Sequence, residues 1–207
     1  ALAGVFASTE MYNRPLDRQL GDGVNDAKKP QDAVHIVREG TPRDLAVMIR
    51  GDANKPGAVA ERAFLTVLSR DGKVRFDRGS GREQLADAIV DRANPLTARV
   101  IVNRIWAALI GQPLVRTPSN FGRLGERPTH PELLDDLAVR FMENGWSLKW
   151  LQREIVLSAT YAQSSVIEPS KSSVDPQNRL LWRMPRRRLS VEAYRDAVLA
   201  VAARLDY

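Results

Sequence analysis

The sequence of 207 residues contains no cysteine and only two histidines, and its aromatic residues make up 6%. The missing cysteines exclude disulfides, thiolate nucleophiles, cysteine-bound zinc, iron–sulfur clusters and covalent c-type haem attachment within this chain. His35 and His130 lie far apart and no H-x-x-x-H spacing occurs, so the sequence predicts no metal site. No apolar run approaches the ~20 residues of a membrane-spanning helix.

Familiar catalytic motifs are also missing. The sequence has no G-x-S-x-G elbow, no P-loop and no G-x-G-x-x-G fingerprint. Asp135 and Asp136 are adjacent on an expected helix, where neighbouring side chains point in different directions and make a poor acid–base pair. The sequence therefore assigns no catalytic residue.

Basic residues are in excess, with a formal net charge of +6 and a pI near 10.0, and arginine accounts for 25 of the 31 basic residues. Arginine offers a planar fork that binds carboxylate, sulfate or phosphate through two hydrogen bonds. A GC-rich genome, which favours arginine codons, explains the same bias without any function. The charge is scattered and no helix-turn-helix or RNA-binding signature occurs, which argues against a nucleic-acid-binding protein.

The N-terminal third predicts turns and short strands. The range 21–32 is rich in turn-forming residues and predicts a loop or linker. Two β-leaning runs, Val34–Val37 and Leu45–Ile49, flank a Gly-Thr-Pro turn and predict a hairpin.

From Ser80 onward, apolar residues recur at helical spacing behind good start signals. Ser80-x-x-Glu83 and Thr129-x-x-Glu132 have the pattern of capping boxes. Asn94-Pro95 predicts the start of a central, nearly all-apolar helix that runs to about residue 111. Further predicted features are a helix stop at Asn144-Gly145, helix caps at Ser147 and Ser190, a polar linker over 164–176, and a short helix from Asp175-Pro176.

These patterns predict a mainly α fold: a compact bundle of about six short helices with a small β-hairpin in the N-terminal third. Residues 1–32 are predicted to be the remnant of a preceding domain and a linker, cut from a longer polypeptide. Residues 33–79 form a mixed β and loop segment that packs on the helical domain, which covers residues 80–207.

Two arginine-rich stretches are the strongest candidates for a binding site. Residues 97–128 hold five arginines against one acid, and residues 178–190 hold five arginines with no acid. Both stretches end where a helix is expected to begin, and backbone N–H groups at a helix start together with arginines favour an anion. The candidate ligand-binding residues are Arg104, Arg116, Arg123, Arg127, His130, Arg186, Arg187 and Arg188.

A structural interpretation of the same residues stays open. The arginines are equally explained by a solvated basic rim or by ion pairs with acids such as Asp135 and Glu192. His130 falls in the first turn of a helix, where the positive end of the helix dipole favours a neutral imidazole in a local hydrogen bond. Arg104 sits beside Asn103 in the apolar helix, where a buried polar pair must find partners.

The stretches over residues 94–165 and 175–201 closely resemble a planctomycete-associated domain family of unknown function, over about Ser80–Asp206. In that family the domain ends large exported proteins that often carry a cytochrome-c-like module. The resemblance implies a periplasmic or cell-surface setting, other domains of the same polypeptide as partners, and any haem in a separate domain. It brings no catalytic residues, and it suggests an acidic or sulfated glycan as ligand by analogy alone.

Three functions follow in order. The first is a non-catalytic binding module of a multidomain exported protein, with an arginine-rich anion-binding surface. The second is a hydrolase-type enzyme acting on an anionic glycan, with Arg104, Arg116, Arg127 and His130 lining its cleft. The third, nucleic-acid binding, is the least supported.

Overall fold

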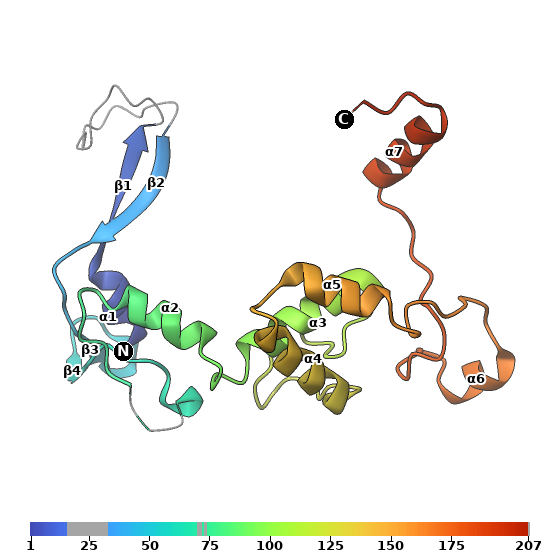
Figure 1. Ribbon diagram of the computed structural model, residues 1–207. Coiled ribbons are helices and arrows are strands. Elements are labelled where there is room, and N and C mark those ends of the chain that lie inside the picture. The colour runs from blue at the N-terminus through green and yellow to red at the C-terminus, as the bar shows by residue number, and fades with distance from the viewer. Residues whose placement is uncertain (16–32, 70–71, 73, 207) are drawn as a thin grey trace. The chain divides into compact units, whose positions relative to one another are not determined.

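The structure is a computed structural model that describes residues 1–15, 33–69, 72 and 74–206. Within these residues it contains seven α-helices and four short β-strands (Figure 1). The helices are α1 (Leu2–Ala7), α2 (Arg82–Val90), α3 (Thr97–Ile110), α4 (Pro131–Glu143), α5 (Leu148–Val156), α6 (Pro169–Val174) and α7 (Val191–Val201). The strands are β1 (Thr9–Pro15), β2 (Ala33–Glu39), β3 (Leu45–Met48) and β4 (Pro56–Ala60). The prediction of a mainly helical fold with a small N-terminal β-hairpin is confirmed.

The chain forms two compact units, residues 1–95 and residues 96–207. All four strands belong to the first unit, and helices α3 to α7 belong to the second. The domain boundary predicted at residue 80 stays a prediction, as does the packing of residues 33–79 on the helical domain. The loop predicted over 21–32 lies outside the described residues.

The strands of the first unit form two antiparallel pairs. β1 pairs with β2, with Thr9 opposite Glu39, and β3 pairs with β4. The prediction that Val34–Val37 pairs with Leu45–Ile49 is therefore wrong, although both runs do form strands. Hydrophobic alternation identifies a strand but not its partner, and here tertiary contacts set the partner.

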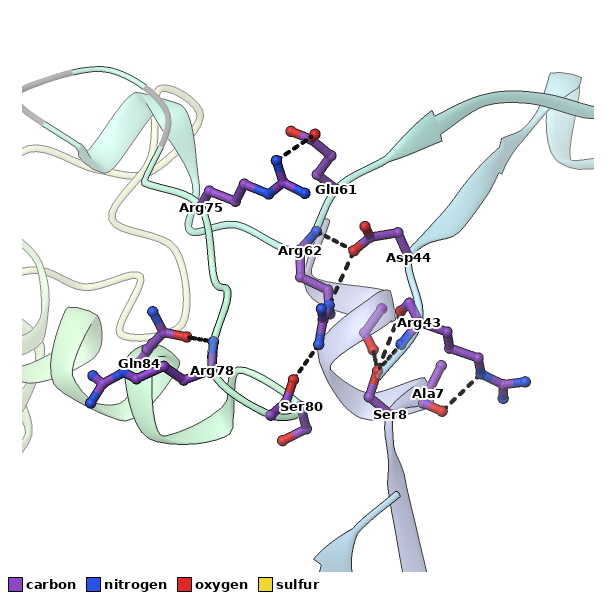
Figure 2. Close-up of polar contacts among 12 residues, drawn as sticks. Ala7, Ser8, Arg43, Asp44, Glu61, Arg62, Arg75, Arg78, Ser80 and Gln84 are labelled. Carbon is purple, nitrogen blue, oxygen red and sulfur yellow. Dashed lines mark hydrogen bonds and ion pairs between the residues drawn. The ribbon is translucent and has the colours of Figure 1, made fainter. Parts of the chain in front are cut away.

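A small core and a polar network hold the first unit together. Its buried apolar residues Val5, Phe64 and Phe76 form one cluster. Around Arg62, which is half-buried as a residue, the Nε atom lies 3.1 Å from Asp44 Oδ1, and the guanidinium also donates to the carbonyl of Gly79 (Figure 2). These contacts fasten the segment before β3 to the loop that precedes α2.

Ser8 makes a second part of that network, at the end of α1. Its buried hydroxyl donates to the carbonyl of Gly4 at 2.7 Å and accepts from the backbone N–H of Arg43 at 2.9 Å (Figure 2). Arg43 Nε donates in turn to the carbonyl of Ala7 at 2.9 Å. A unit with so few buried apolar residues thus depends on polar contacts to fix its loops.

Helices α3, α4 and α5 pack together in the second unit and enclose its core. Apolar residues at helical spacing supply it, as the sequence pattern predicts. The fully or nearly fully buried members are Ala98, Val102, Trp106, Ile110, Leu114, Val115, Leu134, Leu137, Ala138, Phe141, Leu151, Ile155 and Leu181. Leu181 lies far beyond α5 in sequence, so the segment after α6 also packs on this core.

Several predicted helix ends are confirmed. Ser147 Oγ accepts from Trp150 N at the start of α5, and Ser190 Oγ accepts from Ala193 N at the start of α7. Helix α4 ends at Glu143, with Asn144 as its C-cap and Gly145 at φ 65°. These signals act within one turn of the chain, which is why they can be read locally.

Other predicted helix ends are wrong. Helix α4 starts from His130 as N-cap with no side-chain cap, so Thr129 and Glu132 form no capping box. Helix α2 starts from Gly81, and the Ser80 hydroxyl donates to Glu39 Oε1 at 2.9 Å instead of forming a box with Glu83. In both places a tertiary partner takes the hydroxyl that the local pattern assigns to the cap.

Two further boundaries also differ from the prediction. Helix α3 begins at Thr97, later than the predicted start at Pro95. The supposed polar linker contains α6, and Asp175 ends this helix as its C-cap rather than starting another. The side chain of Asp175 instead organises the loop that follows.

Candidate functional site

A pocket with a volume of about 440 Å³ lies in the second unit. Three stretches of that unit line it: the C-terminal half of α3 with the loop after it, the residue before His130, and the loop after α6. The lining residues are Trp106, Gln112, Pro113, Leu114, Arg116, Thr129, Pro176, Gln177, Arg179, Leu181 and Arg183. Its volume lies within the range of about 300–1,000 Å³ that small-molecule sites occupy.

The loop after α3 is positioned by one buried asparagine. Asn103 is completely buried in α3. Its side-chain amide donates to the carbonyl of Val115 at 3.0 Å and its side-chain oxygen accepts from the N–H of Val115 at 2.8 Å. Both backbone groups of Val115 are thereby satisfied inside the core, and the next residue, Arg116, emerges at the pocket with an exposed side chain.

The loop after α6 is built in a parallel way. Asn178 is completely buried, with φ 54°, a left-handed conformation that asparagine tolerates better than most residues. Its side-chain oxygen accepts from the N–H of Arg183 at 3.2 Å, and its amide donates to the carbonyl of Arg183 at 2.9 Å. A second buried asparagine thus fixes a second arginine that lines the pocket.

Asp175 fixes the rest of this loop. Its carboxylate accepts from the backbone N–H of Leu180 at 2.7 Å, and its carbonyl accepts from Trp182 Nε1 at 2.9 Å. The pKa of Asp175 is lowered, first by the hydrogen bond from Leu180, then by the backbone of Arg179 and by the charges of Arg179 and Arg183. The Arg183 guanidinium lies over the Trp182 ring, 5.1 Å from its centroid.

Two polar contacts join the loops across the pocket rim. Gln112 Nε2 donates to the carbonyl of Gln177 at 3.4 Å, and an Arg116 guanidinium nitrogen donates to Gln177 Oε1 at 3.4 Å. Both distances are long for hydrogen bonds, so these contacts are weak. A ligand with stronger acceptor groups can replace them at small cost.

The arginines of the two units differ in their partners. In the first unit Arg38, Arg62, Arg75, Arg78 and Arg82 each pair with a carboxylate within 4.0 Å. Residues 96–207 carry the excess charge, with 16 basic residues against 11 acidic ones. Within the part of the chain that the structure describes, salt bridges are formed by none of Arg104, Arg116, Arg123, Arg127, Arg179, Arg183, Arg186, Arg187 and Arg188.

Two buried N–H groups of the pocket residues have no hydrogen-bond partner. They belong to Trp106 Nε1 and Arg183 Nε. Trp106 is only 3% exposed. An unsatisfied buried donor costs about 1–3 kcal/mol, and such groups are rare in folded proteins. Both of these donors occur on residues that line the same pocket.

The structure brings few of the predicted site residues together. Of the eight candidates only Arg116 lines the pocket. Arg187 donates to the carbonyls of Ala108 and Leu109 near the end of α3, which gives it a structural role. The exposed candidates outside the pocket are Arg104, Arg123, Arg127, Arg186 and Arg188.

His130, the last candidate, does not line the pocket either. Its Nδ1 atom lies 3.0 Å from the hydroxyl of Thr129, a contact within the chain's own turn. The backbone N–H of Thr129 donates to the carbonyl of Leu114 at 2.9 Å, so this helix start offers no free amide there. The predicted use of helix starts by a ligand is not what shapes the pocket.

Sequence reasoning missed Trp106, Arg179 and Arg183 as pocket residues. The signal for Arg183 was present in the turn-forming residues of DPQNRLLWR, since Asp and Asn bond nearby backbone groups in turns. Trp106 follows Asn103 by three residues on α3, so the two share a helix face.

Other kinds of site find no support in the described residues. No three side chains of the metal-binding types come together there. Nor does any helix in the described ranges have the length and apolar character to span a membrane.

A helical module with an arginine-lined pocket is thus the class that fold and site define. Residues 81–207 match the model of a family described as "Protein of unknown function (DUF1553)", and the chain belongs to this family. Comparison with curated proteins and with solved structures finds no match.

Proposed function

We propose that residues 96–207 form a binding module for an anionic ligand, held in the pocket between the loops after α3 and α6. The observation that carries the proposal is the convergence of Arg116, Arg179 and Arg183 on one pocket without a salt-bridge partner. Arginine forks in such a setting bind carboxylate, sulfate or phosphate.

The hydrolase alternative has weaker support. None of the eleven pocket-lining residues is an aspartate or glutamate. Of Arg104, Arg116, Arg127 and His130, which that alternative needs in one cleft, only Arg116 lines the pocket. Glycoside hydrolysis commonly uses a pair of carboxyl groups, and this pocket supplies none.

The biological setting is proposed from the family resemblance. The module would serve a multidomain exported protein, in the periplasm or at the cell surface. Other domains of that polypeptide would be its partners, any haem would sit in one of them, and an anionic glycan is a ligand of the required charge.

The test compares two variants with the same change in charge. Arg116→Gln/Arg179→Gln/Arg183→Gln alters the pocket, whereas Arg104→Gln/Arg123→Gln/Arg127→Gln alters exposed arginines elsewhere. Sulfate and phosphate should raise the melting temperature of the wild type and of the second variant, because a ligand that binds only the folded state stabilises it. Equal responses of both variants would refute the pocket as the binding site.

A further inference from the structure

The lining of the pocket is divided between hydrogen-bond donors and apolar surface. The apolar part comes from Trp106, Pro113, Leu114, Pro176 and Leu181. The side chains of Arg116, Arg179, Arg183 and Gln112 supply N–H donors. Few acceptors oppose them, chiefly the Thr129 hydroxyl and the Gln177 side-chain oxygen.

The donors also differ in burial. Arg116 and Arg179 are exposed, Arg183 is half-buried, and Trp106 is almost completely buried. The exposed guanidinium groups are screened by water and salt, which leaves them weak as anchors. The buried donors of Trp106 and Arg183 are screened far less, and they are the two that lack partners.

The orphan state of Trp106 is specific to this residue of the pair of indoles beside the pocket. The indole of Trp182, one residue before Arg183, donates to the carbonyl of Asp175 at 2.9 Å. The indole of Trp106 makes no such bond, although its ring is packed in the core. Arg183 is held by Asn178 through its backbone and by Trp182 through its guanidinium, so its position is set before a ligand arrives.

We propose that the ligand is an organic oxyanion, meaning a carboxylate, sulfate or phosphate group carried on an apolar body. The anionic oxygens accept from Arg183 and from Trp106 Nε1 once the ligand is seated. The apolar body lies against Pro113, Leu114 and Leu181, and Arg116 and Arg179 attract the charge from the rim. A pocket of about 440 Å³ exceeds what a single inorganic anion fills. This assignment rests on the proposed anion-binding function.

The experiment measures dissociation constants by calorimetry on the 207-residue chain with three kinds of probe. Phenyl sulfate, phenyl phosphate and benzoate carry the three oxyanions on the same ring. Inorganic sulfate and phosphate lack the ring, and benzamide lacks the charge. We expect the best organic anion to bind at least about tenfold more tightly than either inorganic anion, and benzamide not to bind.

Two variants test the anchoring donors. Trp106→Phe removes the indole N–H and keeps a ring, and Trp150→Phe makes the same substitution on α5 outside the pocket. Loss of a hydrogen bond to a charged group predicts a roughly tenfold higher dissociation constant for Trp106→Phe and an unchanged one for Trp150→Phe. Arg183→Lys, which keeps the charge and loses the fork, should show the same loss if Trp106→Phe does not fold.

The outcomes separate this inference from the function on which it rests. Equal affinity for phenyl sulfate and inorganic sulfate, or an unchanged affinity in both Trp106→Phe and Arg183→Lys, overturns the organic oxyanion while anion binding stands. Binding of none of the anions overturns the proposed function itself. The ranking among sulfate, phosphate and carboxylate then identifies the head group.

Discussion

The side chain of Asn178 occupies both backbone polar groups of Arg183, accepting from its N–H at 3.2 Å and donating to its carbonyl at 2.9 Å. Asn103 does the same for Val115, directly before Arg116. Two buried asparagines thus fix the backbone at or beside two pocket arginines. The site is held by the core rather than by flexible surface loops.

Replacing Asn178 should cost stability in a way that separates two causes. Asn178→Ala leaves the backbone groups of Arg183 unpaired and forces alanine into φ 54°, whereas Asn178→Gly removes the side chain without the backbone strain. We expect a loss of about 2–3 kcal/mol for glycine and about 1 kcal/mol more for alanine. Urea unfolding followed by tryptophan fluorescence measures both, since all four tryptophans lie in residues 96–207. Equal losses would show that the positive φ carries no strain.

Asn103 offers a sharper comparison with its neighbour. Asn103→Ala should lower the free energy of unfolding by about 2–3 kcal/mol, because it leaves both backbone groups of Val115 unpaired in the core. Arg104→Ala changes the adjacent exposed residue and should stay within about 0.5 kcal/mol of the wild type. The same fluorescence assay applies. A large loss from Arg104→Ala would mean that this arginine has a structural partner.

The cap of α5 can be tested by one substitution. Ser147→Ala removes the acceptor for Trp150 N and should cost about 1 kcal/mol. Thermal unfolding checks it, with Ser172→Ala on the surface helix α6 as the control, since Ser172 is not a cap. A cost equal to that of the control would contradict the cap.

The acid sensitivity of the first unit is predicted from Glu39. Hydrogen bonds from the backbone and hydroxyl of Ser80, and then from Arg82, lower the pKa of Glu39. A carboxyl with a lowered folded pKa contributes stability above its unfolded value, about 4.3, and this stability is lost as the pH falls through the folded value. Glu39→Gln should therefore flatten the fall in stability between about pH 5 and pH 3, measured by circular dichroism during urea unfolding. An unchanged slope would exclude Glu39 as its source.

Sequence reasoning succeeded where the determining contact is local. Ser147 and Ser190 cap helices through an N–H three residues away, so a short pattern suffices to find them. It failed where a distant residue competes, as when Glu39 takes the hydroxyl of Ser80. The candidate site shows the same limit: arginine-rich stretches were visible, but only the fold reveals that Arg116 meets Arg179 and Arg183 while Arg187 bonds the end of α3.

The indole N–H signals of the ¹⁵N-labelled chain test the central claim most directly, that unpartnered donors in this pocket receive an anion. The chain has four tryptophans, and the signal of Trp106 is assigned by its loss in Trp106→Phe. Titration with phenyl sulfate, and separately with inorganic sulfate, should move the Trp106 signal in a saturable manner and leave that of Trp150 in place. A Trp106 signal that stays fixed while the protein binds either anion would contradict the account.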